Sequence, residues 1–161
     1  MLSAERVRVL LWEWLPAAAM MALIFFLSSQ SALPGPEEKS LDFLLKKLGH
    51  VLAYGAVSLS YLRAVHRTQR PFLLAFLLTL LYAVSDEFHQ SLVPLREGTV
   101  RDVVIDSLAA AAALRGVAQL LTGAQGRWRS LAEALVSPRG SRRGMESRSR
   151  SGARTCPPAA N

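Results

Sequence analysis

Four long apolar stretches constrain the fold of this chain more than any other feature of its sequence. The first runs from about Leu10 to Leu27, and the 13 residues from Leu15 to Leu27 include no polar side chain. The others cover about residues 48–65, 71–84 and 100–121. A helix that is apolar on all sides has no polar face for water, which disfavours a soluble helical bundle. The sequence therefore predicts an all-α integral membrane bundle of four transmembrane helices.

The lengths of these stretches agree with membrane spans. Crossing a hydrocarbon core of about 30 Å takes roughly 20 helical residues. The first and fourth stretches are long enough, the second needs its polar first turn, and the third must continue through residues 85–89. A competing interpretation of the first stretch is a cleaved signal peptide, because Arg6 and Arg8 precede it and residues 29–32 resemble a cleavage site.

Charge divides the chain into two parts. The net charge is +7, and residues 123–161 hold eight Arg and two Glu, so +6 of it lies there. We expect a membrane domain over 1–122 and an Arg/Ser/Pro/Gly-rich, largely disordered tail over 123–161. Within the tail, Arg127 to Val136 is expected to form one or two interfacial turns anchored by Trp128.

The same charges predict orientation and exclude some functions. The positive-inside rule favours a multi-pass protein of the bacterial cytoplasmic membrane with both termini in the cytoplasm. Because the basic charge lies in a tail rather than on a folded surface, we expect no nucleic-acid partner. Cys156 is the only cysteine, which excludes a disulfide scaffold and a cysteine-based zinc site.

Ionisable groups gather at one predicted end of the second, third and fourth spans, where such residues are costly. Lys47, His50 and Tyr54 lie on one face of a helix, at spacings of three and four residues. The candidate site residues are Lys47, His50, Tyr54, Ser85, Asp86, Glu87, His89, Gln90, Arg96, Asp102 and Asp106. Connections between the spans are expected to gather them around one outward-facing cavity.

The start of the fourth span carries two further signals. Thr99 and Asp102 have the spacing of a capping box, with Asp in place of Glu. Small residues follow Asp106 and permit close approach of a neighbouring helix: Ala109, Ala110 and Ala113. Asp106 is expected to be either a neutral, hydrogen-bonded carboxylic acid or the partner of one of four cations: Lys47, Arg96, Arg101 or a protonated histidine.

Three chemical interpretations of this cluster compete. A divalent metal such as zinc or manganese would use Asp86, Glu87, His89 and His50. A general acid–base site would use His89 with Asp86 or Glu87. We favour the third interpretation, a polar network that stabilises the bundle or holds a polar ligand, with no metal or cofactor. The chain has no serine-hydrolase elbow, Walker loop or dinucleotide fingerprint.

The order and spacing of these motifs over about residues 15–120 resemble the VanZ-like family of small bacterial integral membrane proteins. The resemblance rests on Lys47-x2-His50-x3-Tyr54, Ser85-Asp86-Glu87-Phe88-His89-Gln90, Pro94-x-Arg96 and Asp102-x3-Asp106. The family's namesake is associated with resistance to teicoplanin, a lipoglycopeptide that acts on cell-wall precursors outside the membrane. The chain departs from the family pattern at three positions: Leu95 and Ala109 replace Gly, and Asp106 replaces Asn.

The resemblance implies action at the outer face of the membrane on a polar or lipid-linked component of the cell envelope. Arg96 is expected to contact an anion through its guanidinium fork. Asp86, Glu87 and His89 would position or protonate the ligand, and Lys47 and His50 would complete the wall. Two alternatives stay open: an enzyme of lipid or phosphate chemistry using His89 with Asp86 or Glu87, and a structural or partner-binding membrane protein without a ligand.

Overall fold

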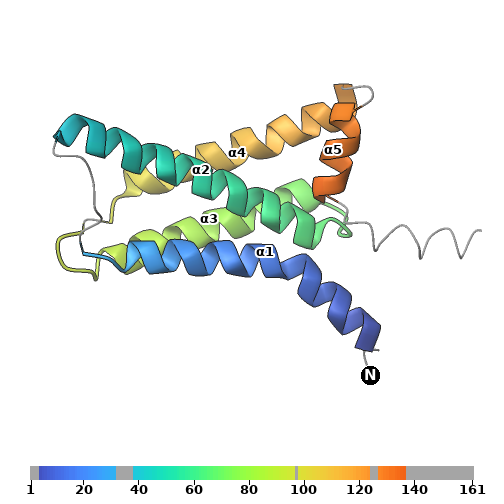
Figure 1. Cartoon of the computed structure of the whole chain (residues 1–161), viewed down its shortest axis with the longest axis horizontal. Coiled ribbons are helices and arrows are strands. Elements are labelled where there is room, and N and C mark those ends of the chain that lie inside the picture. Colours follow the sequence, from blue (N-terminus) through green and yellow to red (C-terminus); the bar gives the residue numbers. More distant parts are fainter. Residues whose placement is uncertain (1–3, 32–37, 97, 124–126, 137–161) are drawn as a thin grey trace, which may run out of the picture.

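The computed structural model describes residues 4–31, 38–96, 98–123 and 127–136, and helices are the only regular secondary structure in this part of the chain. The five helices are α1 (Ala4–Ser28), α2 (Lys39–Val65), α3 (Pro71–Gln90), α4 (Val100–Gly123) and α5 (Arg127–Val136). The four long helices lie side by side and alternate in direction (Figure 1). Short α5 lies across one end of this bundle, beside the end of α4.

Three of these helices are long and apolar enough to cross a membrane among the residues described: Val7–Ser28, Pro71–Gln90 and Val100–Gly123. They agree with the first, third and fourth predicted spans, and α3 continues to Gln90 as the third span requires. Large apolar side chains are exposed along them, for example Phe26 (62%), Leu81 (68%) and Leu108 (64%). Such a surface suits lipid and not water, so the chain is a membrane-embedded helical protein.

Helix α2 is the exception among the predicted spans, because it does not reach the same apolarity. Its 27 residues begin at Lys39, so the helix includes Leu41 and Leu44 ahead of the predicted apolar stretch. Several polar side chains of α2 are buried inside the bundle and lower its mean hydropathy, namely Tyr54, Ser58 and Tyr61. Part of the polarity of α2 thus faces its neighbours α1, α3 and α4, whereas Lys46 near its start is exposed.

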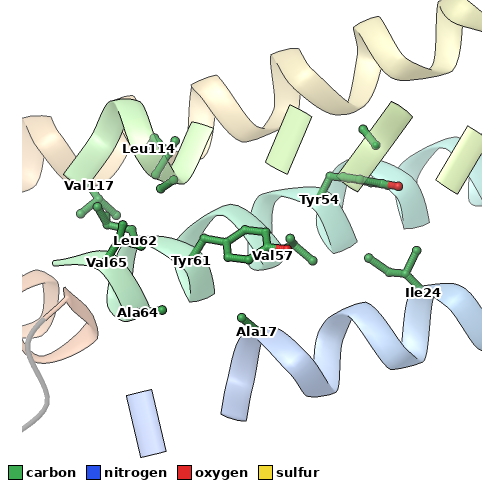
Figure 2. Packing of buried hydrophobic residues seen from close by; sticks show 12 residues of the cluster. Ala17, Ile24, Tyr54, Val57, Tyr61, Leu62, Ala64, Val65, Leu114 and Val117 are labelled. Carbon is green, nitrogen blue, oxygen red and sulfur yellow. The ribbon is translucent and has the colours of Figure 1, made fainter. Parts of the chain in front are cut away.

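Helix α1 packs as a member of the bundle. Ala17 and Ile24 are buried in its core (Figure 2). The Tyr82 hydroxyl of α3 donates a hydrogen bond to the Met21 carbonyl at 2.7 Å. The helix bends in its first half (Figure 1), near Pro16, where a backbone hydrogen bond is lost. These contacts place α1 against α2 and α3 inside the bundle.

Close approach of α2 and α4 brings the polar ends of the helices together. A β-carbon on Gly55 would lie 3.7 Å from that of Ala113, so these helices touch through small residues as predicted. Buried residues of α4 follow helical spacing from Asp106 through Ala110 and Leu114 to Val117. In α3 the buried face changes from Ala75, Thr79 and Ala83 to Asp86, Glu87 and Gln90. The apolar core therefore ends in a polar layer.

The opposite end of the bundle carries a separate ion pair. Arg67, after α2, donates from Nη2 to Oε1 of Glu13 at 2.8 Å, and Glu13 is 2% exposed. Helix α5 covers the segment expected to form interfacial turns, and its Ala132 is buried. The Trp128 side chain and the tail from residue 137 lie outside the described residues. The prediction that Trp128 is an interfacial anchor and the prediction that the tail is disordered both concern these undescribed parts.

Candidate functional site

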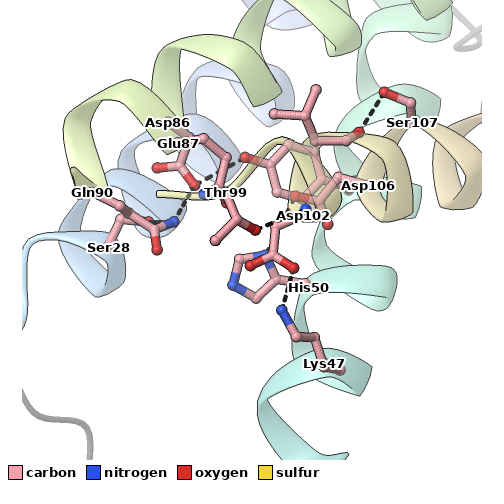
Figure 3. A network of polar contacts seen from close by, with 12 residues as sticks. Ser28, Lys47, His50, Asp86, Glu87, Gln90, Thr99, Asp102, Asp106 and Ser107 are labelled. Carbon is pink, nitrogen blue, oxygen red and sulfur yellow. Dashed lines mark hydrogen bonds and ion pairs between the residues drawn. The ribbon is translucent and has the colours of Figure 1, made fainter. Parts of the chain in front are cut away.

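The polar layer at one end of the bundle contains most of the candidate site residues. It lies where α2 and α4 begin and where α1 and α3 end (Figures 1 and 3). We call it the polar cluster and define it as Lys47, His50, Tyr54, Asp86, Glu87, Gln90, Thr99, Asp102 and Asp106. Four of its members carry carboxylates, and three of these are buried: Asp86, Glu87 and Asp106.

One part of the polar cluster centres on Asp86. Its Oδ2 accepts hydrogen bonds from the Tyr54 hydroxyl at 3.0 Å and from Gln90 Nε2 at 2.9 Å. Gln90 Nε2 also lies 3.3 Å from the Ser28 hydroxyl of α1. Because these four residues come from α1, α2 and α3, the network joins three helices inside the bundle (Figure 3).

The second part joins α2 to α4. Lys47 Nζ pairs with Asp102 Oδ1. One turn deeper, His50 Nδ1 lies 3.4 Å from Oδ2 of Asp106, which is fully buried. Among the partners expected for Asp106, the structure therefore selects a histidine, and Lys47 pairs instead with Asp102.

Glu87 of α3 reaches the N-terminus of α4. The Thr99 hydroxyl accepts a hydrogen bond from the backbone amide of Asp102 at 3.2 Å, which is one half of the predicted capping box. The other half differs from the prediction, because the Thr99 amide donates to Glu87 Oε2 at 2.8 Å and the Asp102 side chain pairs with Lys47. A carboxylate at this position also interacts favourably with the helix dipole.

Gly98 makes this contact possible. A β-carbon at residue 98 would lie 2.1 Å from the carbonyl oxygen of Glu87 and 3.2 Å from the β-carbon of Ser91. Only glycine permits so close a backbone approach without a shift of the chain. The connection between α3 and α4 therefore packs directly on the end of α3.

Three buried carboxylate oxygens have no hydrogen-bond partner among the described residues: Asp86 Oδ1, Glu87 Oε1 and Asp106 Oδ1. Each belongs to a residue that is no more than 5% exposed. Buried polar atoms are seldom left without a partner, because the loss of hydration is costly. The polar cluster thus keeps acceptor capacity that its own contacts do not use.

The remaining candidates contact other parts of the protein. Arg96 donates from Nε to the Gln30 carbonyl and from Nη2 to the Leu27 carbonyl, both at 2.9 Å, and its Nη1 lies 3.4 Å from Gln90 Oε1. It thereby holds the end of α1. A role for Arg96 as an anion contact stays a prediction.

His89 and Ser85 lie apart from the buried carboxylates. The Ser29 hydroxyl donates to the Phe25 carbonyl and lies 3.1 Å from His89 Nε2, so this contact requires the Nε2–H tautomer of His89. The ring of His89 stacks on Phe25 with centroids 4.4 Å apart. Ser85 is exposed on α3, and the structure gives it no contact with the described members of the polar cluster.

The candidate residues that were predicted to surround one cavity therefore fall into two groups. His50, Glu87 and Asp106 come together, with one potential ligand atom from each within 4.8 Å of the others. His89 and Arg96 instead contact the end of α1.

A comparison with protein families agrees with this architecture. The VanZ/LLP1 family model matches residues 13–121, which cover α2, α3 and most of α1 and α4. The chain belongs to the VanZ/LLP1 family. No curated protein and no solved structure gives a significant match to it.

One departure from the VanZ-like pattern has a structural counterpart. Leu95, which stands where VanZ-like proteins usually carry Gly, has a backbone φ of 64°. This is the left-handed region, which costs an L-residue free energy and suits glycine. Its side chain is 90% exposed and gains little from burial. The backbone of this VanZ/LLP1 chain therefore keeps a glycine-like turn without the glycine.

Several residues that build the site were not predicted from the sequence. Gly98 precedes a Thr with capping spacing, which is a local signal for a tight entry into a helix. Ser28, Ser29 and the carbonyls of Leu27 and Gln30 follow the first apolar stretch and carry no comparable signal, because their partners lie about 60 residues away.

Proposed function

We propose that this VanZ/LLP1 protein is a four-span protein of the bacterial cytoplasmic membrane whose polar cluster binds the polar headgroup of a lipid-linked envelope component at the outer face. The observation that carries the proposal is the concentration of buried carboxylates with unpartnered oxygens at one end of a lipid-suited bundle. Ionisable residues at membrane depth are costly and are generally functional.

A fourth span by α2 is part of this proposal. At 1.5 Å per residue, a helix of its length extends for about 40 Å, which exceeds the hydrocarbon thickness. It lies alongside three helices that are apolar enough to span (Figure 1). Its polar residues Tyr54, Ser58 and Tyr61 are turned into the bundle, where their cost against lipid does not arise.

The distribution of arginine supports an outward-facing polar cluster. Arg63, Arg67 and Arg70 follow or end α2 at the opposite end of the bundle, the same end as Arg8 of α1. Lys46, Lys47, Arg96 and Arg101 lie at the polar-cluster end, so the positive-inside rule rests here on the eight arginines after residue 123, which favour a cytoplasmic C-terminus. A periplasmic reporter enzyme fused after Gln125 should be inactive and one fused after Ser91 should be active. The reverse pattern would overturn the orientation.

The ligand chemistry follows from the free donors and acceptors. The unpartnered carboxylate oxygens suit a headgroup that offers hydroxyl, amide or amine hydrogens. The Arg96 guanidinium has five N–H donors. Its contacts among the described residues use one donor each from Nε, Nη1 and Nη2. The rest are available to a phosphate or carboxylate of the same ligand.

Matched variants on one turn of α3 test this function. Asp86→Asn and Glu87→Gln change the polar cluster, whereas Ser85→Ala changes an exposed neighbour. Native mass spectrometry of the purified protein with extracted bacterial membrane lipids should show a lipid adduct for wild type and Ser85→Ala, and a weaker one for the two cluster variants. Equal adducts in all four proteins, or none in wild type, would overturn the ligand proposal.

The same variants test a link to glycopeptide susceptibility. Expression of wild type in a susceptible bacterium should raise the minimal inhibitory concentration of teicoplanin, and Glu87→Gln should abolish the increase while it accumulates normally in the membrane. An unchanged value for accumulated wild type would refute this link without affecting the binding measurement.

A structural role is the second candidate, and the network through Tyr54, Asp86, Gln90 and Ser28 favours it, because it joins three helices. Under that alternative, Asp86→Asn would reduce membrane accumulation and wild type would bind no ligand. For the enzymatic alternative, no described contact joins His89 to Asp86 or Glu87.

A further inference from the structure

Three potential metal ligands from three helices converge inside the polar cluster. They are His50 of α2, Glu87 of α3 and Asp106 of α4, and one donor atom from each lies within 4.8 Å of the others. Nδ1 of His50 lies 3.4 Å from Oδ2 of Asp106. Two ligands on a tetrahedral metal with bonds of about 2.0–2.1 Å lie about 3.4 Å apart. Small side-chain rotations would complete the set.

The unpartnered oxygens give independent support. Glu87 Oε1 and Asp106 Oδ1 are buried and accept no hydrogen bond from the described residues. Their residues are 5% and 0% exposed, so solvent does not provide an easy substitute. Such atoms are expected where an ion supplies the missing partner.

The charges of the three residues also favour a bound cation. Glu87 and Asp106 together offer two negative charges, and Asp106 contacts His50, which is charged only if protonated. Lys47 is engaged by Asp102. Two carboxylates and a neutral imidazole are balanced by one divalent cation.

Neighbouring contacts hold the ligands as in known metal sites. The Thr99 amide fixes Oε2 of Glu87 at 2.8 Å and leaves Oε1 available. Such outer contacts orient the ligating groups. The helix packing at Gly55 and Ala113 sets the separation of the helices that carry His50 and Asp106.

We propose that His50, Glu87 and Asp106 form a binding site for one divalent transition-metal ion of the zinc or manganese class. Imidazole with carboxylate favours these ions over magnesium and calcium, which prefer oxygen ligands alone. Three protein ligands leave a coordination position for water or for an anionic group. The site differs from the set considered from sequence, because Asp86 and His89 have other partners. It uses two of the three unpartnered oxygens also assigned to the headgroup, and metal titration in the absence of lipid tests it separately.

The test uses the full chain in detergent, without an affinity tag and with Cys156→Ser to remove the thiol. After treatment with a chelator and its removal, isothermal titration with Zn²⁺ in excess Mg²⁺ should show one bound equivalent. Titration with Co²⁺ should give visible absorption bands of a site with nitrogen and oxygen ligands. No saturable binding of Zn²⁺ and no Co²⁺ bands would overturn the proposal.

Matched variants locate the site. His50→Gln, Glu87→Gln and Asp106→Asn should each abolish stoichiometric binding, whereas His66→Gln and His89→Gln should retain it. Asp106→Asn restores the residue usual in VanZ-like proteins, so it is expected to fold, and size-exclusion chromatography with circular dichroism checks each variant. Binding that persists in folded Asp106→Asn and Glu87→Gln, or that is lost in His66→Gln, would assign the metal to another place and overturn the proposal.

Discussion

Replacing Gly98 with alanine gives the sharpest test of how the site is built. The added β-carbon would lie 2.1 Å from the Glu87 carbonyl oxygen. An unstrained carbon–oxygen contact is about 3.3 Å, so the backbone of the α3–α4 connection must move by about 1 Å. We therefore expect Gly98→Ala to separate the α4 N-terminus from Glu87.

The magnitude follows from two contributions. Forcing a methyl group into a packed site costs about 1–3 kcal/mol. Losing the hydrogen bond from the Thr99 amide to the Glu87 carboxylate adds about 1.5–3 kcal/mol, because a charged acceptor is left without its donor. The sum of about 2.5–6 kcal/mol corresponds to a decrease in Tm of roughly 5–20 °C for a chain of this size.

Thermal unfolding of the detergent-solubilised protein, followed by tryptophan fluorescence, measures this effect. Gly116→Ala is the matched control, because a β-carbon there meets nothing within 4 Å and alanine favours the helix. Its Tm should equal or exceed that of wild type. If Gly98→Ala unfolds within about 2 °C of the control, the close approach to Glu87 does not hold the connection, and the argument is refuted.

Three further substitutions test other contacts, with Tm as the measurement. Leu95→Gly should stabilise the protein by about 0.5–1 kcal/mol, because it relieves a left-handed backbone while removing an exposed side chain; a lower Tm would contradict this. Tyr54→Phe should cost about 1.5–3 kcal/mol by removing a donor to the Asp86 carboxylate, and more than Tyr61→Phe, whose hydroxyl contacts only the Met21 sulfur among the described residues; equal losses would show that the Asp86 contact contributes nothing special. Arg67→Gln should cost about 1–3 kcal/mol by leaving the buried Glu13 carboxylate without its donor, and adding Glu13→Gln should recover part of the loss; additive losses would indicate that the pair does not interact.

The sequence predicts most of the fold, because apolar length and helical periodicity are local properties. The four apolar stretches become the four long helices. The third had to continue past its apolar residues to span a membrane, and α3 does so by ending at Gln90. Helix α2 is the least apolar span by composition, since it carries exposed or half-buried charged residues such as Lys46 and Arg63 and also buries polar groups such as Tyr54 and Ser58 among its neighbours. Single-sequence hydropathy cannot distinguish a polar residue facing a partner from one facing lipid.

The site is predicted less completely, because its pairing depends on which helix ends meet and at what height. Spacing places Lys47 and His50 on one face of α2, and the fold then pairs them with Asp102 and Asp106, which repeat the same one-turn interval on α4. Spacing also suggests a capping box, but the carboxylate that accepts the Thr99 amide comes from α3. Neither partner is visible in the local pattern.

Interhelical polar contacts also explain how this bundle fixes the relative heights of its helices. Between helices in lipid, apolar packing alone gives little preference for one register, because lipid tails are as apolar as the side chains they replace. Here each polar pair joins two helices at a defined height: His50 with Asp106, Tyr54 with Asp86, and Glu13 with Arg67 beyond the end of α2.

The two carboxylate oxygens of Glu87 have different roles: one holds the fold together and the other is available to a ligand. Glu87 Oε2 accepts the Thr99 amide, whereas Oε1 is buried without a partner among the described residues. Glutamine at this position keeps an oxygen for the amide and removes the charge that a cation or a polar headgroup would require. Glu87→Gln should therefore lose binding with little loss of stability, whereas Gly98→Ala should lose both. A variant pair that behaved alike in both measurements would show that the two oxygens do not have separate roles.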